Sequence, residues 1–237
     1  MISIIIPAHN EKENLKELIP YLEGLITPVN CEIIIALSST NSDRTLIASE
    51  KSTTTYNVCS KSGRALQMNY GAEIAKGDIF VFLHADVKPP VSFIKDILQT
   101  IDAGNDAGFF SYRFDKRNFL LDINASFTSK DGIFTGGGDQ CLFIKKEVFQ
   151  RLGRFDAAQV IMEDFEFFSR MKKNKVKYKI VKNDLIVSAR KYENNSYLKV
   201  NLSNLLLVTL FNFGYPAQKL KMLHNKLLKM PYTIKSH

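Results

Sequence analysis

The sequence predicts an α/β fold in which a mixed, mostly parallel central sheet is flanked by helices. Short apolar runs, of the kind found in buried strands, alternate with segments whose apolar residues recur at helical spacing. The chain has 237 residues, of which 45% are hydrophobic, so it can bury one sizeable core. Strands that alternate with helices are typical of parallel sheets with right-handed crossover connections.

The first half of the chain shows this alternation most clearly. Isoleucines dominate the first apolar run, as in a buried parallel strand, and Gly77 stands where a helix would end. Asn41 or Ser42 can cap the second helix. The predicted strands are Ile2–Pro7, Glu32–Leu37, Tyr56–Cys59 and Ile79–Leu83, and the predicted helices are Asn14–Leu25, Ser42–Glu50, Gly63–Lys76 and Val91–Ile101.

The pattern becomes less regular after about Ala107. We expect strands at Gly108–Phe114 and Cys141–Ile144, and a strand, a turn and a second strand over Lys177–Val187. The predicted helices are Phe119–Thr128, Lys146–Leu152, Met162–Lys173, Ser196–Phe213 and Gln218–Lys229. No repeat or linker separates these elements, so we expect one domain over residues 1–195, with residues 196–237 as a helical appendage packed on it.

Ligands of open parallel sheets bind beyond the carboxyl ends of the strands. That rule selects three segments, Ala8–Glu11, Ser38–Asp43 and His84–Asp86. A carboxylate placed like that of Asp86 can hold Mg²⁺ or Mn²⁺ against a diphosphate, and His84 faces the same side in an extended chain. The structural alternative is that Asp86 caps a turn before the proline pair that follows.

Three acids, Glu163, Asp164 and Glu166, stand at the start of a predicted helix. A carboxylate there can deprotonate an attacking hydroxyl group. Acids in a first turn also complement the helix dipole, and Asp164 can serve as the N-cap, so both interpretations remain open.

The glycine run Gly136–Gly138 gives up side chains at a cost in stability, which suggests close approach by a ligand or another segment. Asp139 and Gln140 directly follow it and offer hydrogen bonds to a polar substrate such as a sugar. An ordinary hairpin loop is the alternative.

Two basic positions can contact phosphate. Arg64 opens a helix after Gly63, and Arg190 is followed by a lysine and a tyrosine. Neither a Walker nor a dinucleotide-binding fingerprint is present. A solvated basic edge is the structural alternative for Arg190.

Taken together and in this order, these segments resemble glycosyltransferase family 2, over nearly the whole chain. Within that family the sequence is most similar to a bacterial subgroup of small, soluble enzymes associated with radical-SAM and selenium-related genes. The segments that carry the resemblance are Ser3–Glu11, Gly63–Ala65, Phe82–Asp86, Gly138–Gln140, Met162–Asp164 and Ser188–Arg190.

The resemblance implies a GT-A fold, a nucleoside-diphosphate-sugar donor (commonly a UDP-sugar), a hydroxyl acceptor and a divalent metal ion, Mg²⁺ or Mn²⁺. It implies that the donor lies among Pro7, Ala8, Glu11, Ser38, Arg64, His84, Ala85, Asp86 and Arg190, with Asp86 as the metal ligand. It places the acceptor at Gly138, Asp139 and Gln140, with Asp164 as the general base, supported by Glu163.

Two positions depart from the pattern of that family. The second strand ends at Ser38 rather than at an acid that reads the nucleobase, and Asp43 lies further along. The aspartate pair of the metal-binding motif has become His84-Ala85-Asp86, so a metal ion would rely on one carboxylate. A nucleotidyltransferase and a non-catalytic sugar- or nucleotide-binding relative therefore remain as alternatives.

A formal charge of +8 suits phosphate-bearing ligands, nucleic acid or an anionic membrane surface. We expect no nucleic-acid partner, because the basic residues lack interleaved aromatic residues. The three cysteines fit no disulfide or metal pattern and are expected to be buried thiols. No secretory signal is visible, and no apolar run reaches the roughly 18 residues of a transmembrane helix, so we expect a cytoplasmic protein.

The helix Ser196–Phe213 is rich in leucine, and lysines follow it. Such a segment can dock on an anionic bilayer and reach a lipid acceptor at the inner membrane surface. The alternative is that it packs against its own domain or a second subunit of a homodimer, which the interrupting asparagines favour.

Overall fold

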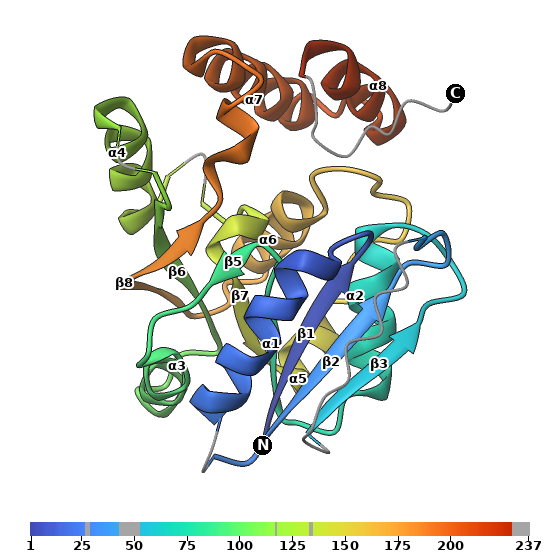
Figure 1. Ribbon diagram of the computed structural model, residues 1–237, viewed down its shortest axis with the longest axis vertical. Coiled ribbons are helices and arrows are strands. Elements are labelled where there is room, and N and C mark those ends of the chain that lie inside the picture. Colours follow the sequence, from blue (N-terminus) through green and yellow to red (C-terminus); the bar gives the residue numbers. More distant parts are fainter. Residues whose placement is uncertain (27–28, 43–52, 117, 133–134, 229–237) are drawn as a thin grey trace.

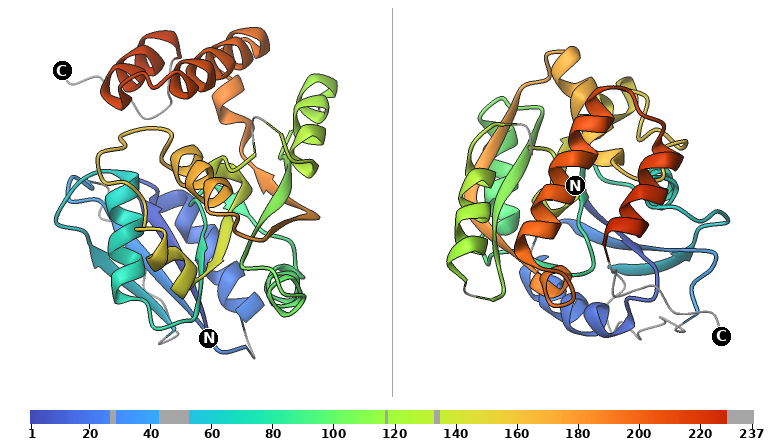
Figure 2. Two further views of the ribbon diagram at one scale, coloured as in Figure 1. Left: turned by 180° about the vertical axis from the view of Figure 1, so that it is seen from behind. Right: turned by 90° about the horizontal axis from the view of Figure 1, so that it is seen from above.

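The computed structural model describes residues 1–26, 29–42, 53–116, 118–132 and 135–228. Within these residues an eight-stranded mixed sheet has helices on both faces (Figures 1 and 2). Its order is β3-β2-β1-β4-β7-β6-β8-β5. The strands are β1 (Ile2–Ala8), β2 (Cys31–Leu37), β3 (Thr54–Val58), β4 (Ile79–Phe82), β5 (Val87–Lys88), β6 (Ala107–Phe114), β7 (Leu142–Lys145) and β8 (Tyr178–Val187). The predicted α/β fold is confirmed.

The order of the strands reverses at β1. β1 pairs in parallel with β2 on one side and with β4 on the other, and β3 extends the sheet beyond β2. β7 runs antiparallel to both β4 and β6, whereas β6 and β8 are parallel. Parallel sheets bind ligands where the order reverses, which is here beyond the carboxyl ends of β1 and β4. We call this region the switch point.

The two faces of the sheet have separate cores. Ile4 and Ile6 of β1 pack with the helices on one face, and Ile5 packs with the helices on the other. This alternation follows from the two-residue period of a strand, and all three side chains are 0% exposed. On the second face, Gly71 lets its helix approach Ile5 closely. The first face carries α1 (Lys12–Ile26) and α3 (Phe93–Asp102), and the second carries α2 (Arg64–Ile74), α5 (Lys146–Arg151) and α6 (Glu163–Lys173).

The remaining helices are α4 (Phe119–Ser126), α7 (Tyr197–Asn212) and α8 (Ala217–Leu227). Figure 1 shows α7 and α8 crossing beyond the carboxyl ends of β1 to β3. Ser196 caps α7 by accepting a hydrogen bond from the backbone N–H of Lys199 at 3.4 Å. The predicted appendage is thus a packed helical pair, while its boundary at residue 195 stays a prediction. Among the described residues, no helix has the length and apolarity that crossing a bilayer requires.

The prediction of two strands over Lys177–Val187 was wrong, because β8 continues through the expected turn. One residue of β6, Ser111, lies opposite the three residues 182–184 of β8, so the extra residues form a bulge. Asp184 accepts a hydrogen bond from the Ser111 hydroxyl at 2.5 Å, and Asn183 donates to Asp96 at 2.7 Å. The polar residues that suggested a turn therefore have hydrogen-bond partners while the strand continues through them.

The other predicted elements differ from the observed ones mainly at their ends. The two-residue strand β5 was not predicted, and the predicted helix Ser42–Glu50 falls almost entirely outside the described residues. The three cysteines are free and buried, as predicted.

Candidate active site

A buried glutamine joins the ends of β1 and β2 at the switch point. The amide N–H₂ of Gln67, on α2, donates to the carbonyl of Ala8 at 2.9 Å and to that of Ala36 at 2.7 Å. The backbone N–H of Ser38 also donates to Ala8, at 2.9 Å. Pro7 is half-buried, whereas Ala8 and Ser38 are 1% and 2% exposed. These residues therefore form a rigid floor for any ligand at this end of the sheet.

The loops after β1 and β2 are tied together by paired asparagines. The backbone N–H of Asn10 donates to the side chain of Asn41 at 2.7 Å, and Ser42 donates to the side chain of Asn10 at 2.8 Å. Asn10 has the positive φ of 57° that asparagine tolerates. The Ser38 hydroxyl lies 3.0 Å from the hydroxyl of Thr40. The contact of Ser38 with a nucleobase stays a prediction.

One arginine joins two acids from distant parts of the chain. Arg190 donates to Asp86 at 2.8 Å and to Glu11 at 3.5 Å. Asn14 donates to the second oxygen of Glu11 at 2.5 Å. Burial raises the pKa of Glu11, and the Asn14 hydrogen bond and the Arg190 charge partly offset that rise. We call Glu11, Asp86 and Arg190 the arginine-bridged end of the site.

A second cluster combines two acids with one arginine at the start of α6. Arg64 lies 3.2 Å from the carboxylate of Glu163 and 4.0 Å from that of Asp164. The side chains of Glu163 and Asp164 are only 4% and 12% exposed, whereas that of Arg64 is 52% exposed. Burial, and then the charge of Glu163, raise the pKa of Asp164 to about 7. We call Arg64, Glu163 and Asp164 the acidic end of the site.

The structural alternative for Asp164, that it caps α6, does not hold. Met162 occupies the N-cap position with a left-handed φ of 65°, and no side chain caps this end. Asp164 is therefore inside the first turn, where the helix dipole favours a negative charge without fixing the side chain to the backbone. Its carboxylate remains available to face the switch point.

Gly138 brings the glycine-rich loop against the acidic end and against His84, two residues before Asp86. A β-carbon at this position would lie 2.4 Å from His84 Cε1 and 2.5 Å from Asp164 Oδ2, so any other residue would force one of these side chains to shift. The close approach predicted for this loop is confirmed. Next to it, Asp139 Oδ1 lies 3.5 Å from His84 Nδ1. Burial and the charge of Arg64 oppose protonation of His84, but Asp139 and Asp164 outweigh them and raise its pKa.

Gln140 is buried rather than turned to solvent. Its side-chain oxygen accepts a hydrogen bond from the backbone N–H of Gly136 at 2.8 Å, and its N–H₂ donates to the carbonyl of Thr128 at 3.0 Å. It therefore fixes the glycine-rich loop, and its predicted contact with an acceptor stays a prediction.

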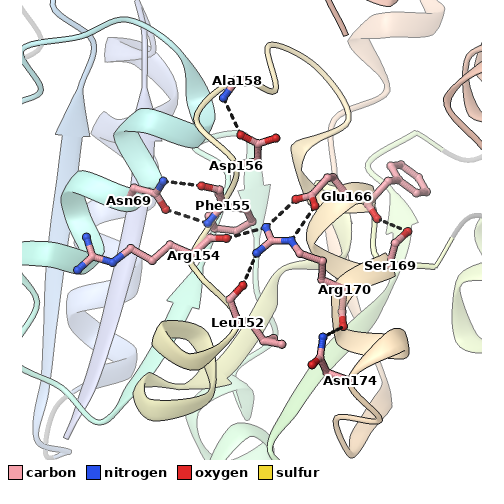
Figure 3. A network of polar contacts seen from close by, with 11 residues as sticks. Asn69, Leu152, Arg154, Phe155, Asp156, Ala158, Glu166, Ser169, Arg170 and Asn174 are labelled. Atoms are coloured by element: carbon pink, nitrogen blue, oxygen red, sulfur yellow. Dashed lines mark hydrogen bonds and ion pairs between the residues drawn. The ribbon is translucent and has the colours of Figure 1, made fainter. Parts of the chain in front are cut away.

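A polar network fixes the chain segment that leads into α6 (Figure 3). Arg170 of α6 pairs with Glu166 at 2.6 Å and donates to the carbonyls of Leu152 and, at 2.6 Å, Arg154. Asn69 of α2 exchanges two hydrogen bonds with the backbone of Phe155, at 2.8 and 3.0 Å. Since α2 begins at Arg64 and α6 begins at Glu163, this network sets how the two helix starts meet.

Sequence reasoning missed the basic side chains that α8 brings toward the site. Burial and the charge of Arg64 lower the pKa of Lys221, and burial and the charge of Lys191 lower the pKa of His224 to about 4. Lys191 itself donates to Asn204 of α7 at 3.3 Å. Only the fold places these residues together, because no motif in the sequence connects α8 with Arg64.

Asp86 offers a metal ion a single carboxylate. Within the described parts of the chain, no group of three or more His, Cys, Asp or Glu side chains could hold an ion. Mg²⁺ is often bound by one or two carboxylates together with substrate phosphates and water, and Asp86 with neighbouring Glu11 fits that donor set. His84 fits it less well, because its imidazole is directed to Asp139.

Solved structures share this fold. The mannosyltransferase PcManGT from Pyrobaculum calidifontis, in complex with GDP-Man and Mn²⁺, superposes with a TM-score of 0.64 at 17% identity, covering 95% of this chain and 68% of that one. TarS 1-349 of S. aureus, in complex with UDP-GlcNAc, gives a TM-score of 0.62 at 14% identity, covering 95% and 71%. The fold of this protein is that of the GT-A glycosyltransferases.

Curated relatives are similar over shorter stretches. The chain is 30% identical over 110 residues to a dolichol-phosphate mannosyltransferase of Pyrococcus furiosus, covering 44% of this chain and 31% of that protein. It is 27% identical over 187 residues to an uncharacterized glycosyltransferase of Haemophilus influenzae, covering 72% and 62%. The chain thus spans less than two thirds of either relative. The profile of Glycosyl transferase family 2 matches residues 3–150, which is more than half of the chain. This protein belongs to glycosyl transferase family 2.

Proposed function

We propose that this protein transfers a sugar from a nucleoside-diphosphate-sugar to the hydroxyl group of an acceptor, with inversion at the anomeric carbon. The observation that carries the proposal is the buried Asp164, whose pKa of about 7 suits a general base. It stands at the switch point beside Arg64, and the cation Arg190 comes from the other side of the same region.

The reaction would proceed as a single displacement. The acceptor oxygen forms a bond to the anomeric carbon while the bond between that carbon and the phosphate oxygen breaks. Asp164 takes the hydroxyl proton, and the bonding electrons leave with the nucleoside diphosphate. Arg190, with Arg64 and Lys191, would stabilise the charge that the diphosphate gains. A divalent ion bound at Asp86 would neutralise part of the same charge.

The other predicted site residues take supporting roles in this proposal. Glu163 pairs with Arg64 at 3.2 Å, which holds Arg64 in place beside Asp164. Pro7, Ala8, Glu11 and Ser38 would surround the nucleoside, with His84 and Ala85 leading into Asp86. Gly138, Asp139 and Gln140 would shape the acceptor side.

The nucleobase is the least constrained part of the donor. We propose a UDP-sugar, although β2 ends at Ser38 without an acid to read the base. Two neighbours of similar fold were solved with different donors, GDP-Man and UDP-GlcNAc, so fold alone does not choose between them. The cytoplasmic location, the homodimer and the bacterial radical-SAM- and selenium-associated subgroup also stay predictions.

A thermal-shift panel of UDP and GDP, each with and without Mn²⁺, tests the donor directly. A ligand at about 100 times its Kd stabilises the native state by roughly 2.7 kcal/mol, which gives a clear rise in Tm. We expect one nucleotide to give a shift that Mn²⁺ enlarges, and Asp86→Asn to remove the Mn²⁺ contribution. Asp102→Asn, at an exposed position of α3, is the matched control.

Release of the nucleoside diphosphate from the donor, with water or an added acceptor, then tests catalysis. A nucleotide that binds but is never released from its sugar would favour the non-catalytic alternative. No shift with any nucleotide, from well-folded protein, would contradict the proposal itself.

A further inference from the structure

Helix α7 has an apolar face that the described part of the chain leaves exposed. Leu198, Leu202 and Leu205 are 69%, 64% and 44% exposed, and Leu206 is 42% exposed. Residues three and four positions apart share one face of a helix, so these side chains form a stripe along α7. Val200 and Leu207, on the opposite face, are 0% and 3% exposed and supply the packing against the protein. The exposed leucines are therefore not part of the buried core.

Helix α4 and the turn after it carry a second apolar stripe. Phe119 is 77% exposed, Leu120 43%, Ile123 40% and Phe127 64%. The buried residues of α4, Leu121 and Ala125, again lie on another face. Two aromatic rings and two aliphatic side chains are exposed on α4 and the turn after it. Such a cluster is larger than the single exposed apolar side chains that are normal on a protein surface.

The two stripes adjoin each other. The side-chain N–H₂ of Asn124 on α4 donates to Asn201 on α7 at 3.1 Å. Asn124 lies four residues after Leu120, and Asn201 lies three after Leu198 and four before Leu205, so each asparagine borders its own stripe. Both helices stand at the same end of the molecule, beyond the carboxyl ends of the strands (Figures 1 and 2). We call the two stripes together the α4–α7 face.

The charges on the α7 and α8 side of this face are positive. No Asp or Glu follows Glu193 in the sequence, whereas lysines recur on α7 and α8. Near α4 the charges are balanced, because Lys116 pairs with Glu193 at 2.5 Å and Lys130 is followed by Asp131. A second copy of this chain docked on the same face would bring lysines against lysines. An anionic bilayer surface offers the complementary charge and an apolar layer beneath it.

We propose that the α4–α7 face is a docking surface for an anionic lipid bilayer. The exposed leucines and phenylalanines would enter the boundary between head groups and acyl chains, while the lysines contact the anionic head groups. Docking in this way would hold the end of the molecule that carries the switch point close to the lipid surface. The inference does not depend on sugar transfer and would stand if that proposal failed.

Sedimentation of the full chain with vesicles tests the proposal. The probes are vesicles of phosphatidylcholine alone and of phosphatidylcholine with about a third phosphatidylglycerol, at low and at high salt. We expect at least tenfold stronger binding to the anionic vesicles at low salt, and loss of most of that preference at high salt, since salt screens the attraction between the lysines and the anionic head groups. This arm needs no variant.

Matched variants locate the face. Leu198→Glu with Leu202→Glu, and separately Phe119→Glu, should each lower binding at least about tenfold, because each places a charge where an apolar side chain must enter the bilayer. Val91→Glu, at an 82% exposed position before α3, should bind as the natural chain does. Unchanged Tm values and unchanged nucleotide shifts would show that the variants fold.

Three outcomes would overturn the inference. One is absence of binding to anionic vesicles at low salt, and another is binding that the α4–α7 variants leave intact. The third is a dimer in light scattering that Leu198→Glu with Leu202→Glu dissociates, without vesicle binding, because a second copy then covers this face.

Discussion

The two ends of the candidate site hold their carboxylates in opposite ways. At the arginine-bridged end, Arg190 lies 2.8 Å from Asp86, and both side chains are about a quarter exposed, at 25% and 24%. At the acidic end, Glu163 and Asp164 are nearly buried and share Arg64, and neither Arg64 nor His84 fully offsets the burial and the Glu163 charge that raise the pKa of Asp164. A compensated carboxylate is suited to binding cations and phosphate, whereas an uncompensated one is suited to accepting a proton.

The largest expected effect tests the acidic end. Asp164→Asn keeps the shape of the side chain and removes its ability to take a proton. We expect turnover to fall by on the order of 10³-fold, as for loss of a general base, while donor binding in the thermal-shift assay stays within about twofold. In the natural chain, turnover should rise with pH up to about pH 7, because Asp164 must be ionised to act.

Asp102→Asn, at an exposed position, serves as the control for that substitution. Turnover retained by Asp164→Asn would remove Asp164 from the role of base. A pH profile that stays flat through pH 7 in the natural chain would do the same.

The second prediction tests the arginine-bridged end. Arg190→Met removes the cation that faces Asp86 and Glu11, and we expect kcat/KM to fall about 30- to 100-fold with weaker donor binding, since charge-assisted contacts to phosphate are lost. Arg190→Lys should recover part of that loss. The two ends would then differ in kind, with binding lost at one and turnover lost at the other. Equal effects on donor binding from Asp164→Asn and Arg190→Met would contradict this division.

The third prediction concerns the position where the ends meet. Gly138→Ala places a methyl group against His84 and Asp164, where less than 3 Å is available. We expect about a tenfold loss of turnover and a loss of roughly 1 to 3 kcal/mol of stability, as in other overpacked sites. Gly132→Ala, where a β-carbon would meet no atom within 4 Å, is the matched control. Steady-state rates and denaturant unfolding of both variants provide the comparison.

The sequence predicted most of the fold because buried strands leave a local signature. The runs that became β1, β2 and β4 are apolar apart from Ser3 and Glu32, and each was placed to within about two residues of its observed ends. The bulge in β8 was missed because it depends on partners in other elements, such as Asp96 for Asn183. Local polarity alone cannot distinguish such a bulge from a turn.

The candidate site shows the same difference between features with a local sequence signature and features that depend on tertiary packing. The fold rule placed Ala8, Ser38 and Asp86 at one edge of the sheet, and the structure brings Glu11, Asp86 and Arg190 together there. The pairing of Arg64 with Glu163 depends on how α2 and α6 meet, and the placement of Lys221 depends on how α8 packs. Both are tertiary relations that leave no pattern within either segment.

The smallest expected effect is on stability and separates the ends by their response to pH. The pKa of Asp164 is raised in the folded chain to about 7, so the folded state binds this proton more tightly than the unfolded state does. Asp164 therefore makes the protein less stable as the pH rises from about 4 to about 7, and the loss persists above that range. Asp164→Asn cannot ionise, so above pH 7 it should be more stable than the natural chain by on the order of 1 to 2 kcal/mol.

Denaturant unfolding at pH 4 and pH 8 measures the difference, which should nearly vanish at the lower pH. If the stability difference between Asp164→Asn and the natural chain were the same at pH 8 as at pH 4, Arg64 would already compensate the charge of Asp164. The contrast between the two ends would then be lost.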